Sequence, residues 1–295
     1  MKKMERFRDY LTKKGLQPTT AKRYTSYLET LYFPYFEKTQ TPIEKVKYTD
    51  LLAYVNYLQE KDFSVNYINH ILSAVRHYYN YLKTTGKVTK NPAAELFIKG
   101  SVRRIPHDLF STEKLEEIYT GFNQKGIVGK RNKILLGLII YQGLNTTELS
   151  LLEPLHLRLR EGKIDVPGTN QKNRRTLKLE AHQMIDLQEY VTSTRDLILA
   201  ITEKETARLF TSMGSSYNLA NTLYKITKTL KKQHTDFKNL QQIRQSRIAL
   251  WTKQYDIRQA QYLAGHKYVS STERYEKTNL EDLQKELNKH HPLNE

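Results

Sequence analysis

Three residues near the C-terminus stand at a spacing that restricts what this chain can fold into. Arg244 lies 22 residues before His266, which follows Gly265, and Tyr275 lies nine residues beyond that His. Taken singly they favour ordinary roles, because a chain with 21 Tyr and 48 Lys plus Arg offers many chance matches. Arg244 alone indicates a surface ion pair, His266 alone a structural histidine, and Tyr275 alone a packed ring. Their shared register favours one common site instead.

Composition limits the class of partner. The chain has 295 residues and 38% hydrophobic content, enough for about two domains with a packed core each. Its net charge of +17 attracts polyanions. The Lys and Arg residues spread along the whole chain rather than gather in one block, which favours nucleic acid over a membrane surface. The longest apolar run, residues 134–141, is also far shorter than the ~20 residues of a membrane span. We expect a nucleic-acid partner and no membrane partner.

The absence of cysteine removes several kinds of chemistry. Without Cys there is no disulfide, no thiolate zinc site and no Cys nucleophile. This composition suits a reducing compartment, so a cytoplasmic location is expected. The sequence also lacks a His-Glu-x-x-His motif, a Gly-x-x-x-x-Gly-Lys phosphate loop and paired carboxylates at two-metal spacing. We expect neither a metal ion nor another cofactor.

The first hundred residues carry apolar side chains at helical spacing. This pattern predicts about four or five helices joined by short turns. Ser64 is predicted to cap one helix, and Thr19 or Thr20 to cap an earlier one. The inward face of the helix after Ser64 is predicted to consist of Ile68, Ile71, Leu72, Val75, Tyr79 and Leu82.

A basic segment interrupted by Gly and Pro follows Asn91-Pro92 and predicts a domain boundary. We assign residues 1–98 to a helical domain, 99–110 to a basic linker and 111–295 to a second domain. An ordinary solvated position is at least as expected for any single basic residue of the helical domain. The basic residues predicted to contact DNA phosphates from this part of the chain are Lys22, Arg23, Arg76, Lys83, Arg103 and Arg104.

The second domain is predicted to combine helices with a small antiparallel sheet. Helices are expected at residues 111–122 and 132–142, and alternating side chains over residues 157–179 predict the strands. A short amphipathic stretch, residues 280–287, follows Tyr275. The predicted fold class is mainly α with a small antiparallel β-sheet in the C-terminal domain.

The arrangement of Arg244, Gly265-His266 and Tyr275 resembles the catalytic core of the tyrosine recombinases, also called the phage integrase family. The resemblance implies a SAM-like core-binding domain, then a catalytic domain with a C-terminal tail helix, both closing around double-stranded DNA. It further implies that Tyr275 attacks a DNA phosphate, forms a 3′-phosphotyrosyl bond and releases a 5′ hydroxyl without a cofactor. A phenol has an unperturbed pKa of ~10, so the attack needs cationic neighbours, which Arg244 and His266 are expected to supply.

Two positions depart from the family pattern. The turn Gly143-Leu144-Asn145 has Asn where the family has Arg, and an amide brings neither the charge nor the bidentate fork of a guanidinium. Gln241 replaces the His of the family's His-x-x-Arg helix. Residues three apart share one helix face, so Gln241 and Arg244 are expected to reach one phosphate, although an amide cannot shuttle a proton.

The resemblance also implies a catalytic Lys at a hairpin tip. An ungapped count back from Leu179 places it at Asn170, whereas a turn different by two residues places it at Lys172. Lys172 is our candidate. The adjacent Arg174 and Arg175 either face DNA or are exposed strand residues. The candidates to replace the charge missing at Asn145 are Lys172, Arg174, Arg175 and Arg247.

These observations predict a site-specific DNA recombinase or integrase of a mobile-element type, acting as a homotetramer on two duplexes. The alternatives are a catalytically weakened or inactive DNA-binding relative with an architectural or regulatory role, and an enzyme that nicks one strand without exchange. Retention of Tyr275, His266 and Arg244 in register argues against simple decay. The stretch 280–287 is expected either to dock onto a neighbouring protomer or to pack within its own chain.

Overall fold

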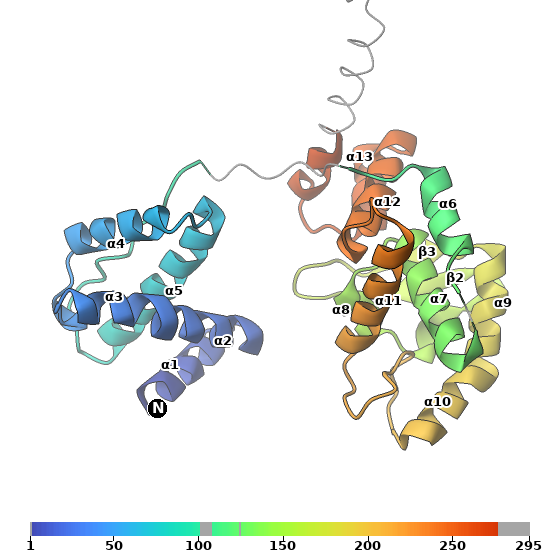
Figure 1. The fold of residues 1–295 in the computed structure, drawn as a ribbon, viewed down its shortest axis with the longest axis horizontal. Coiled ribbons are helices and arrows are strands. Elements are labelled where there is room, and N and C mark those ends of the chain that lie inside the picture. The colour runs from blue at the N-terminus through green and yellow to red at the C-terminus, as the bar shows by residue number, and fades with distance from the viewer. Residues whose placement is uncertain (1, 101–107, 124, 277–295) are drawn as a thin grey trace, which may run out of the picture. The chain divides into compact units, whose positions relative to one another are not determined.

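The chain forms two compact units, Met1–Arg103 and Arg104–Glu295. The computed structural model describes residues 2–100, 108–123 and 125–276 (Figure 1). Helices predominate, and three strands form one antiparallel sheet in the second unit, so the predicted fold class is confirmed. Within the described ranges, no helix is both long enough and apolar enough to cross a membrane. The assignment of each unit to a function stays a prediction.

The first unit is built around its longest helix, α5 (Val65–Thr84). Ser64 caps it, since its side chain accepts a hydrogen bond from the Tyr67 N–H at 3.3 Å, and the whole predicted inward face is buried. The predicted Thr caps are wrong, because α2 begins at Pro18, whose fixed φ suits the first helical position. The other elements of this unit are α1 (Lys2–Lys13), α2 (Pro18–Tyr27), the π-helical turn η1 (Leu28–Tyr32), α3 (Phe33–Lys38), η2 (Ile43–Lys45) and α4 (Tyr48–Glu60).

Aromatic rings fill the core of the first unit. Tyr32 packs edge-on against both Tyr54 and Tyr79, and the hydroxyls of Tyr32 and Tyr79 are 2.6 Å apart. The Tyr79 hydroxyl also donates to the Ile43 carbonyl at 2.9 Å. Burial raises the pKa of the Tyr32 phenol well above its usual value. Tyr32 and Tyr79 therefore serve as neutral packing residues with hydrogen-bonded tips.

The second unit packs around α7 (Gly126–Ile140), which contacts α6, α9, α11 and α12. Its residues 134–140 are buried on all sides, and each fully buried Leu or Ile contributes about 1.5–3 kcal/mol. The helix begins six residues before the predicted start at 132. The helices of this unit are α6 (Thr112–Thr120), α7, α8 (Thr146–Leu151), α9 (Ala181–Glu189), α10 (Arg195–Thr202), α11 (Ala220–Gln233), α12 (Leu240–Gln254) and α13 (Ile257–Ala264), with short turns η3 (Pro154–His156), η4 (Leu159–Glu161) and η5 (Tyr190–Thr194).

The sheet runs in the order β1 (Leu157–Arg158), β2 (Lys163–Val166) and β3 (Arg175–Lys178). In β3 the buried side chains are those of Arg175 and Leu177, because successive residues of a strand point to opposite faces. The loop between β2 and β3 ends in a two-residue turn at Asn170-Gln171, closed by the backbone pair Thr169 and Lys172. Beyond α13, residues 270–276 are helical, and the predicted stretch 280–287 lies outside the described residues.

Candidate active site

A pocket of about 320 Å³ lies in the second unit where several elements end. The C-terminal end of α7, the start of α8, the β2–β3 loop, the start of α12 and the helical residues 270–276 all contribute to it. No acidic side chain is among the residues that line it, all of which are described. They are Ile139, Leu144, Asn145, Thr146, Lys172, Leu240, Gln241, Arg244, Gln245, His266, Arg274 and Tyr275. The six residues predicted as catalytic are all in this set.

Tyr275 and His266 lie together at the pocket wall. Their rings are nearly parallel, with centroids 6.3 Å apart and planes 17° apart, and both side chains are buried. The Nδ1 atom of His266 lies 2.8 Å from the Thr272 hydroxyl. Burial, with the charges of Lys172 and Arg244, lowers the pKa of His266 to about 2. His266 is therefore neutral at pH 7, and the expectation that it supplies a cation is wrong.

Two structural features favour glycine at position 265, directly before His266. It ends α13 with φ of +65°, a left-handed conformation that favours glycine. A Cβ atom on Gly265 would also lie 2.3 Å from Nη1 of Arg175. The turn therefore places His266 beside Lys172 of the β2–β3 loop, and any larger residue at 265 displaces either the turn or the arginine.

Arg244 is held in place by three acceptors. Its Nη1 donates to the Gly143 carbonyl and to Glu148 Oε2, the latter at 3.3 Å, and its Nη2 donates to the Ala264 carbonyl at 2.8 Å. The residue as a whole is 7% exposed. A guanidinium has five N–H donors, and these bonds occupy three of them, so two remain for an anion in the pocket.

Glu148 is the buried counterion of two arginines. Its Oε1 accepts from Arg175 Nη1 at 2.6 Å, and Oε2 accepts from Arg244. Burial opposes ionisation of Glu148, but the two guanidinium groups more than offset it and hold its pKa below the usual value. The prediction that Arg175 is an exposed strand residue is wrong, because the pleat of β3 turns it inward to this carboxylate, and its contact with DNA stays a prediction. A buried pair of this kind fixes geometry more than it adds stability.

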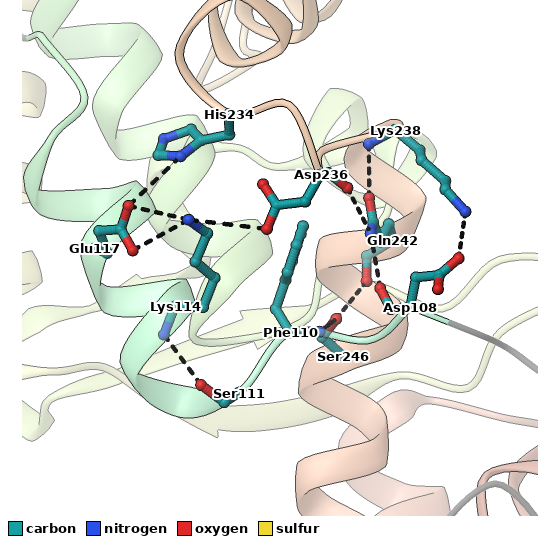
Figure 2. A network of polar contacts seen from close by, with 10 residues as sticks. All are labelled: Asp108, Phe110, Ser111, Lys114, Glu117, His234, Asp236, Lys238, Gln242 and Ser246. Carbon is teal, nitrogen blue, oxygen red and sulfur yellow. Dashed lines mark hydrogen bonds and ion pairs between the residues drawn. The ribbon is translucent and has the colours of Figure 1, made fainter. Parts of the chain in front are cut away.

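A polar network fixes the N-terminal end of α12, the helix of Arg244 (Figure 2). Gln242 donates to the backbone carbonyls of Asp108 and Asp236 and accepts from the Lys238 N–H. The Ser246 hydroxyl accepts from the Phe110 N–H at 2.8 Å. These bonds join the segment before α6, the loop after α11 and the first turns of α12. The position of Arg244 is thus determined by contacts remote in sequence.

Lys172, rather than Asn170, lines the pocket, whereas Asn170 is exposed at the loop tip. The loop is docked onto the turn that carries His266, since the Asn173 N–H donates to the Gly265 carbonyl at 3.0 Å and Lys172 pairs with His266. Burial, followed by the charge of Arg244, lowers the pKa of Lys172 to about 7. An amine with this pKa donates and recovers a proton at neutral pH.

Asn145 and Gln241 both line the pocket but differ in their bonds. Asn145 caps α8: its Oδ1 accepts from the Glu148 N–H, and its own N–H donates to Glu148 Oε2, both at 2.8 Å. The cap does not use its side-chain NH₂, an uncharged group that can donate to a ligand. Gln241 is exposed and lies one helical turn before Arg244, as its spacing predicts.

The other predicted contacts fall in different places. Arg174 is exposed near the pocket loop, while Arg247 donates to the Ile140 carbonyl and lies over the Tyr141 ring, outside the lining of this pocket. In the first unit, Arg76 is not exposed as predicted, because its guanidinium ties the chain after α5 to that helix through the Ala93 and Leu96 carbonyls. Exposed positions are confirmed for Lys22, Arg23 and Lys83, and the residues outside the described part are Arg103 and Arg104.

Sequence reasoning missed two parts of this site. Glu148 stands in the Gly-Leu-x-x-x-Glu-Leu pattern, but nothing in that pattern shows that two arginines converge on it. Arg274 precedes Tyr275, and its Nη2 donates to the Tyr275 hydroxyl at 3.0 Å. The only sequence signal for Arg274 is its adjacency to the tyrosine, which on a helix does not predict contact.

Comparisons with known proteins find relatives over most of the chain. The family profile described as "Phage integrase, N-terminal SAM-like domain" matches residues 4–86. Tyrosine recombinase XerD of Shewanella oneidensis is 25% identical over 96% of this chain and 94% of its own length. Tyrosine recombinase XerC of Oceanobacillus iheyensis is 24% identical over 98% and 95%.

Solved structures share the fold. The XerH site-specific recombinase, bound to a palindromic difH substrate in a post-cleavage complex, matches with a TM-score of 0.73 and 17% identity, over 93% of this chain and 80% of that one. An integrase of the transposon Tn1549, in complex with a circular intermediate DNA, matches with a TM-score of 0.63 over 92% and 94%. The profile match and the near-full-length relatives support the tyrosine recombinase family for this chain.

Proposed function

We propose that this protein is a site-specific recombinase that cleaves and rejoins double-stranded DNA through a 3′-phosphotyrosyl intermediate on Tyr275. The observation that carries the proposal is the convergence of Tyr275 with Arg244, Lys172 and His266 on one pocket, whose lining within the described part of the chain includes no acidic side chain. A net charge of +17 and relatives named as recombinases support DNA as the partner.

The pocket residues suit a transesterification in which atoms and charge balance. The Tyr275 oxygen forms a bond to phosphorus as the bond from phosphorus to the 5′ oxygen breaks, and the phenol proton leaves to solvent. Lys172 donates a proton to the departing 5′ oxygen, consistent with its lowered pKa. The remaining N–H donors of Arg244 stabilise the phosphorane oxygens. Attack by a 5′ hydroxyl from a partner strand reverses these steps.

His266 acts in this scheme as a neutral hydrogen-bonding group. When the Thr272 hydroxyl donates to Nδ1, the ring proton stands on Nε2 and is available to a phosphate oxygen. Gln241 and Asn145 add neutral amide donors at the pocket edge. A pure binding protein has no need of a tyrosine among these groups, which disfavours the architectural alternative.

Complete exchange requires cleavage of four strands on two duplexes. Because each protomer carries one Tyr275, we propose a homotetramer on DNA. The exposed Lys22, Arg23 and Lys83 are proposed phosphate contacts of the first unit, and Arg174 of the second. Sedimentation of the protein with two equivalents of its site tests the stoichiometry, with four protomers per two duplexes expected.

Trapping on a nicked duplex tests the reaction. The binding site is first selected from random duplexes. A nick is then placed beside each candidate phosphate, so that the short strand released with a 5′ hydroxyl diffuses away and cannot reverse the attack. The intact protein and Tyr268→Phe should give a covalent band on a denaturing gel, and Tyr275→Phe none. Tyr268 is a matched control because it is 73% exposed and lies outside the pocket lining.

The alternatives predict different gels. Specific binding without a covalent band from the intact protein would favour an architectural role. A covalent band without recombinant product from two intact duplexes would favour a nicking enzyme.

A further inference from the structure

Arg274 reaches the reacting oxygen from the neighbouring position in the chain. Its Nη2 donates to the Tyr275 hydroxyl at 3.0 Å, and its guanidinium carbon lies 4.9 Å from the centre of the phenol ring. Consecutive helical residues point about 100° apart, so they do not ordinarily meet. This contact forms because the long arginine side chain bends back across the ring. The cation therefore sits against both the face and the oxygen of the tyrosine.

The charges of the pocket show why this contact matters. The cations among its lining residues, all described, are Lys172, Arg244 and Arg274. Arg244 shares its charge with the buried Glu148, and Lys172 is only partly protonated near pH 7. Asn145 caps α8 and brings no charge. Arg274 thus adds a permanent positive charge next to the nucleophile, because a guanidinium does not deprotonate in proteins.

The charge of Arg274 is also felt across the pocket. Burial is the main cause of the lowered pKa of Lys172 and of His266, and the positive charge of Arg274 is among the further causes for both. Its field therefore spans the groups that would surround a phosphate. Charges placed this way stabilise an anion that forms between them.

We propose that Arg274 is a catalytic residue, whose guanidinium favours the phenolate of Tyr275 and then stabilises the phosphorane in place of a charge at Asn145. This inference rests on the proposed function and adds no bond-making step to it. As the phenol proton leaves to solvent, the hydrogen bond from Nη2 strengthens, since it then meets a full negative charge. During attack the same group neutralises charge that spreads onto the phosphate oxygens.

Single-turnover cleavage of the nicked duplex tests the role of Arg274. The variants are Arg274→Gln, Arg274→Lys and, as a matched control, Arg160→Gln, since Arg160 is exposed and outside the pocket. Arg274→Gln should slow adduct formation by about 10²–10³-fold, the usual effect of removing one oxyanion donor. Arg274→Lys should recover part of the rate, and Arg160→Gln should match the intact protein.

A neutral substrate separates a charge effect from a structural one. Replacing the scissile phosphate by a methylphosphonate removes its negative charge, so the defect of Arg274→Gln should shrink by at least about tenfold. An equal defect on both substrates would assign Arg274 a structural role and overturn the proposal. Cleavage by Arg274→Gln within a few-fold of the intact protein would overturn it too.

A second-site change tests the claim that Arg274 replaces a charge at Asn145. The double variant Asn145→Arg/Arg274→Gln should cleave at least about tenfold faster than Arg274→Gln, because an arginine at 145 restores a cation to the pocket. A double variant no faster than the single one would overturn this claim. Absence of an adduct from the intact protein would instead overturn the proposed function itself, so the two failures are distinguishable.

Discussion

The two units differ in the groups that surround their buried tyrosines. In the first unit Tyr32, Tyr54 and Tyr79 are buried against other rings, and burial raises their pKa, so they stay neutral. In the second unit Tyr275 is equally buried, at 1% exposed, but a guanidinium contacts it. Burial alone therefore does not mark a nucleophile. What distinguishes Tyr275 is its neighbours, the Arg274 guanidinium and the other residues of the pocket.

The same contrast holds for charge. The core of the first unit contains one hydroxyl pair, Tyr32 with Tyr79, whereas the second unit contains Glu148, Arg175 and Arg244 in one buried network. Such a network costs desolvation energy, and it fixes the position of Arg244 at the pocket. The first unit is thus expected to tolerate loss of a polar group better than the second.

Removal of the proposed proton donor should give the largest effect. Lys172→Gln should slow cleavage by about 10²–10⁴-fold, the range of general-acid catalysis. A substrate with sulfur in place of the 5′ bridging oxygen should abolish most of this defect, because a thiolate leaves without a proton. The comparison is made by single-turnover trapping. A defect of the same size on both substrates would contradict the role of proton donor.

The pH dependence sharpens this prediction. Lys172 donates only when protonated, and its pKa of about 7 means that the donor form is lost as the pH rises above 7. The second-order rate constant of cleavage, which reports the free protein, should therefore fall between about pH 7 and 9. The sulfur-bridged substrate should show no such fall. A flat profile up to pH 9 on the ordinary substrate would contradict the role of Lys172 as proton donor.

Among the stability changes, removal of the Glu148 carboxylate, the counterion shared by two arginines, should lower the free energy of unfolding the most. Glu148→Gln leaves Arg175 and Arg244 without a buried carboxylate and should cost about 3–5 kcal/mol of unfolding free energy. The single Trp of the chain, Trp251, is buried in α12 of this unit, so its fluorescence in urea reports the loss. The control is Glu189→Gln, a surface pair with Lys130 expected to change stability by less than about 1 kcal/mol. Equal effects would show that the buried network adds no more stability than a surface ion pair of the same unit.

A pair of glycine substitutions compares the units at matched backbone geometry. Gly15 in the first unit has φ of +82° with nothing within 4 Å of a built Cβ, whereas Gly265 has φ of +65° and meets the pinned Arg175. Gly15→Ala should cost only the backbone strain, about 1–2 kcal/mol. Gly265→Ala should cost about 1–3 kcal/mol more from overpacking. Urea unfolding followed by circular dichroism measures both, and equal costs would show that Arg175 moves freely.

The smallest effect is expected in the aromatic core. Tyr79→Phe removes the bonds to Tyr32 and to the Ile43 carbonyl and should cost about 1–2 kcal/mol. Circular dichroism should show this loss, while the Trp251 transition should stay in place, because Trp251 lies in the other unit. A shift of the Trp251 transition would mean that the two units do not unfold independently.

Periodicity and spacing predicted the parts of the structure that are local. The inward face of α5, the Ser64 cap and the small sheet follow from patterns of a few residues, and the structure confirms them. The start of α7 and the cap of α2 were misplaced, since the apolar run hides the first turns of α7 and Pro18 overrides the nearby threonines.

The sequence predicted which residues line the pocket, but it did not predict their charge states. The motif brought Arg244, His266 and Tyr275 together, and Lys172 reached the pocket through a loop docked on Gly265 that no spacing rule contains. The neutral state of His266 depends on burial and on the charges of Lys172, Arg175, Arg244 and Arg274. The inward turn of Arg175 depends on strand register, which a sequence count at a loop of unknown length does not fix.

Peptide mapping of the trapped DNA adduct is the most direct test of the central claim. The covalent complex formed by the intact protein is digested with protease and nuclease, and the peptide that carries the nucleotide is identified by mass spectrometry. We predict one modified peptide, linked through Tyr275 to a 3′ phosphate. An adduct on another tyrosine, or a protein that binds its site tightly and yields no modified peptide, would contradict the account.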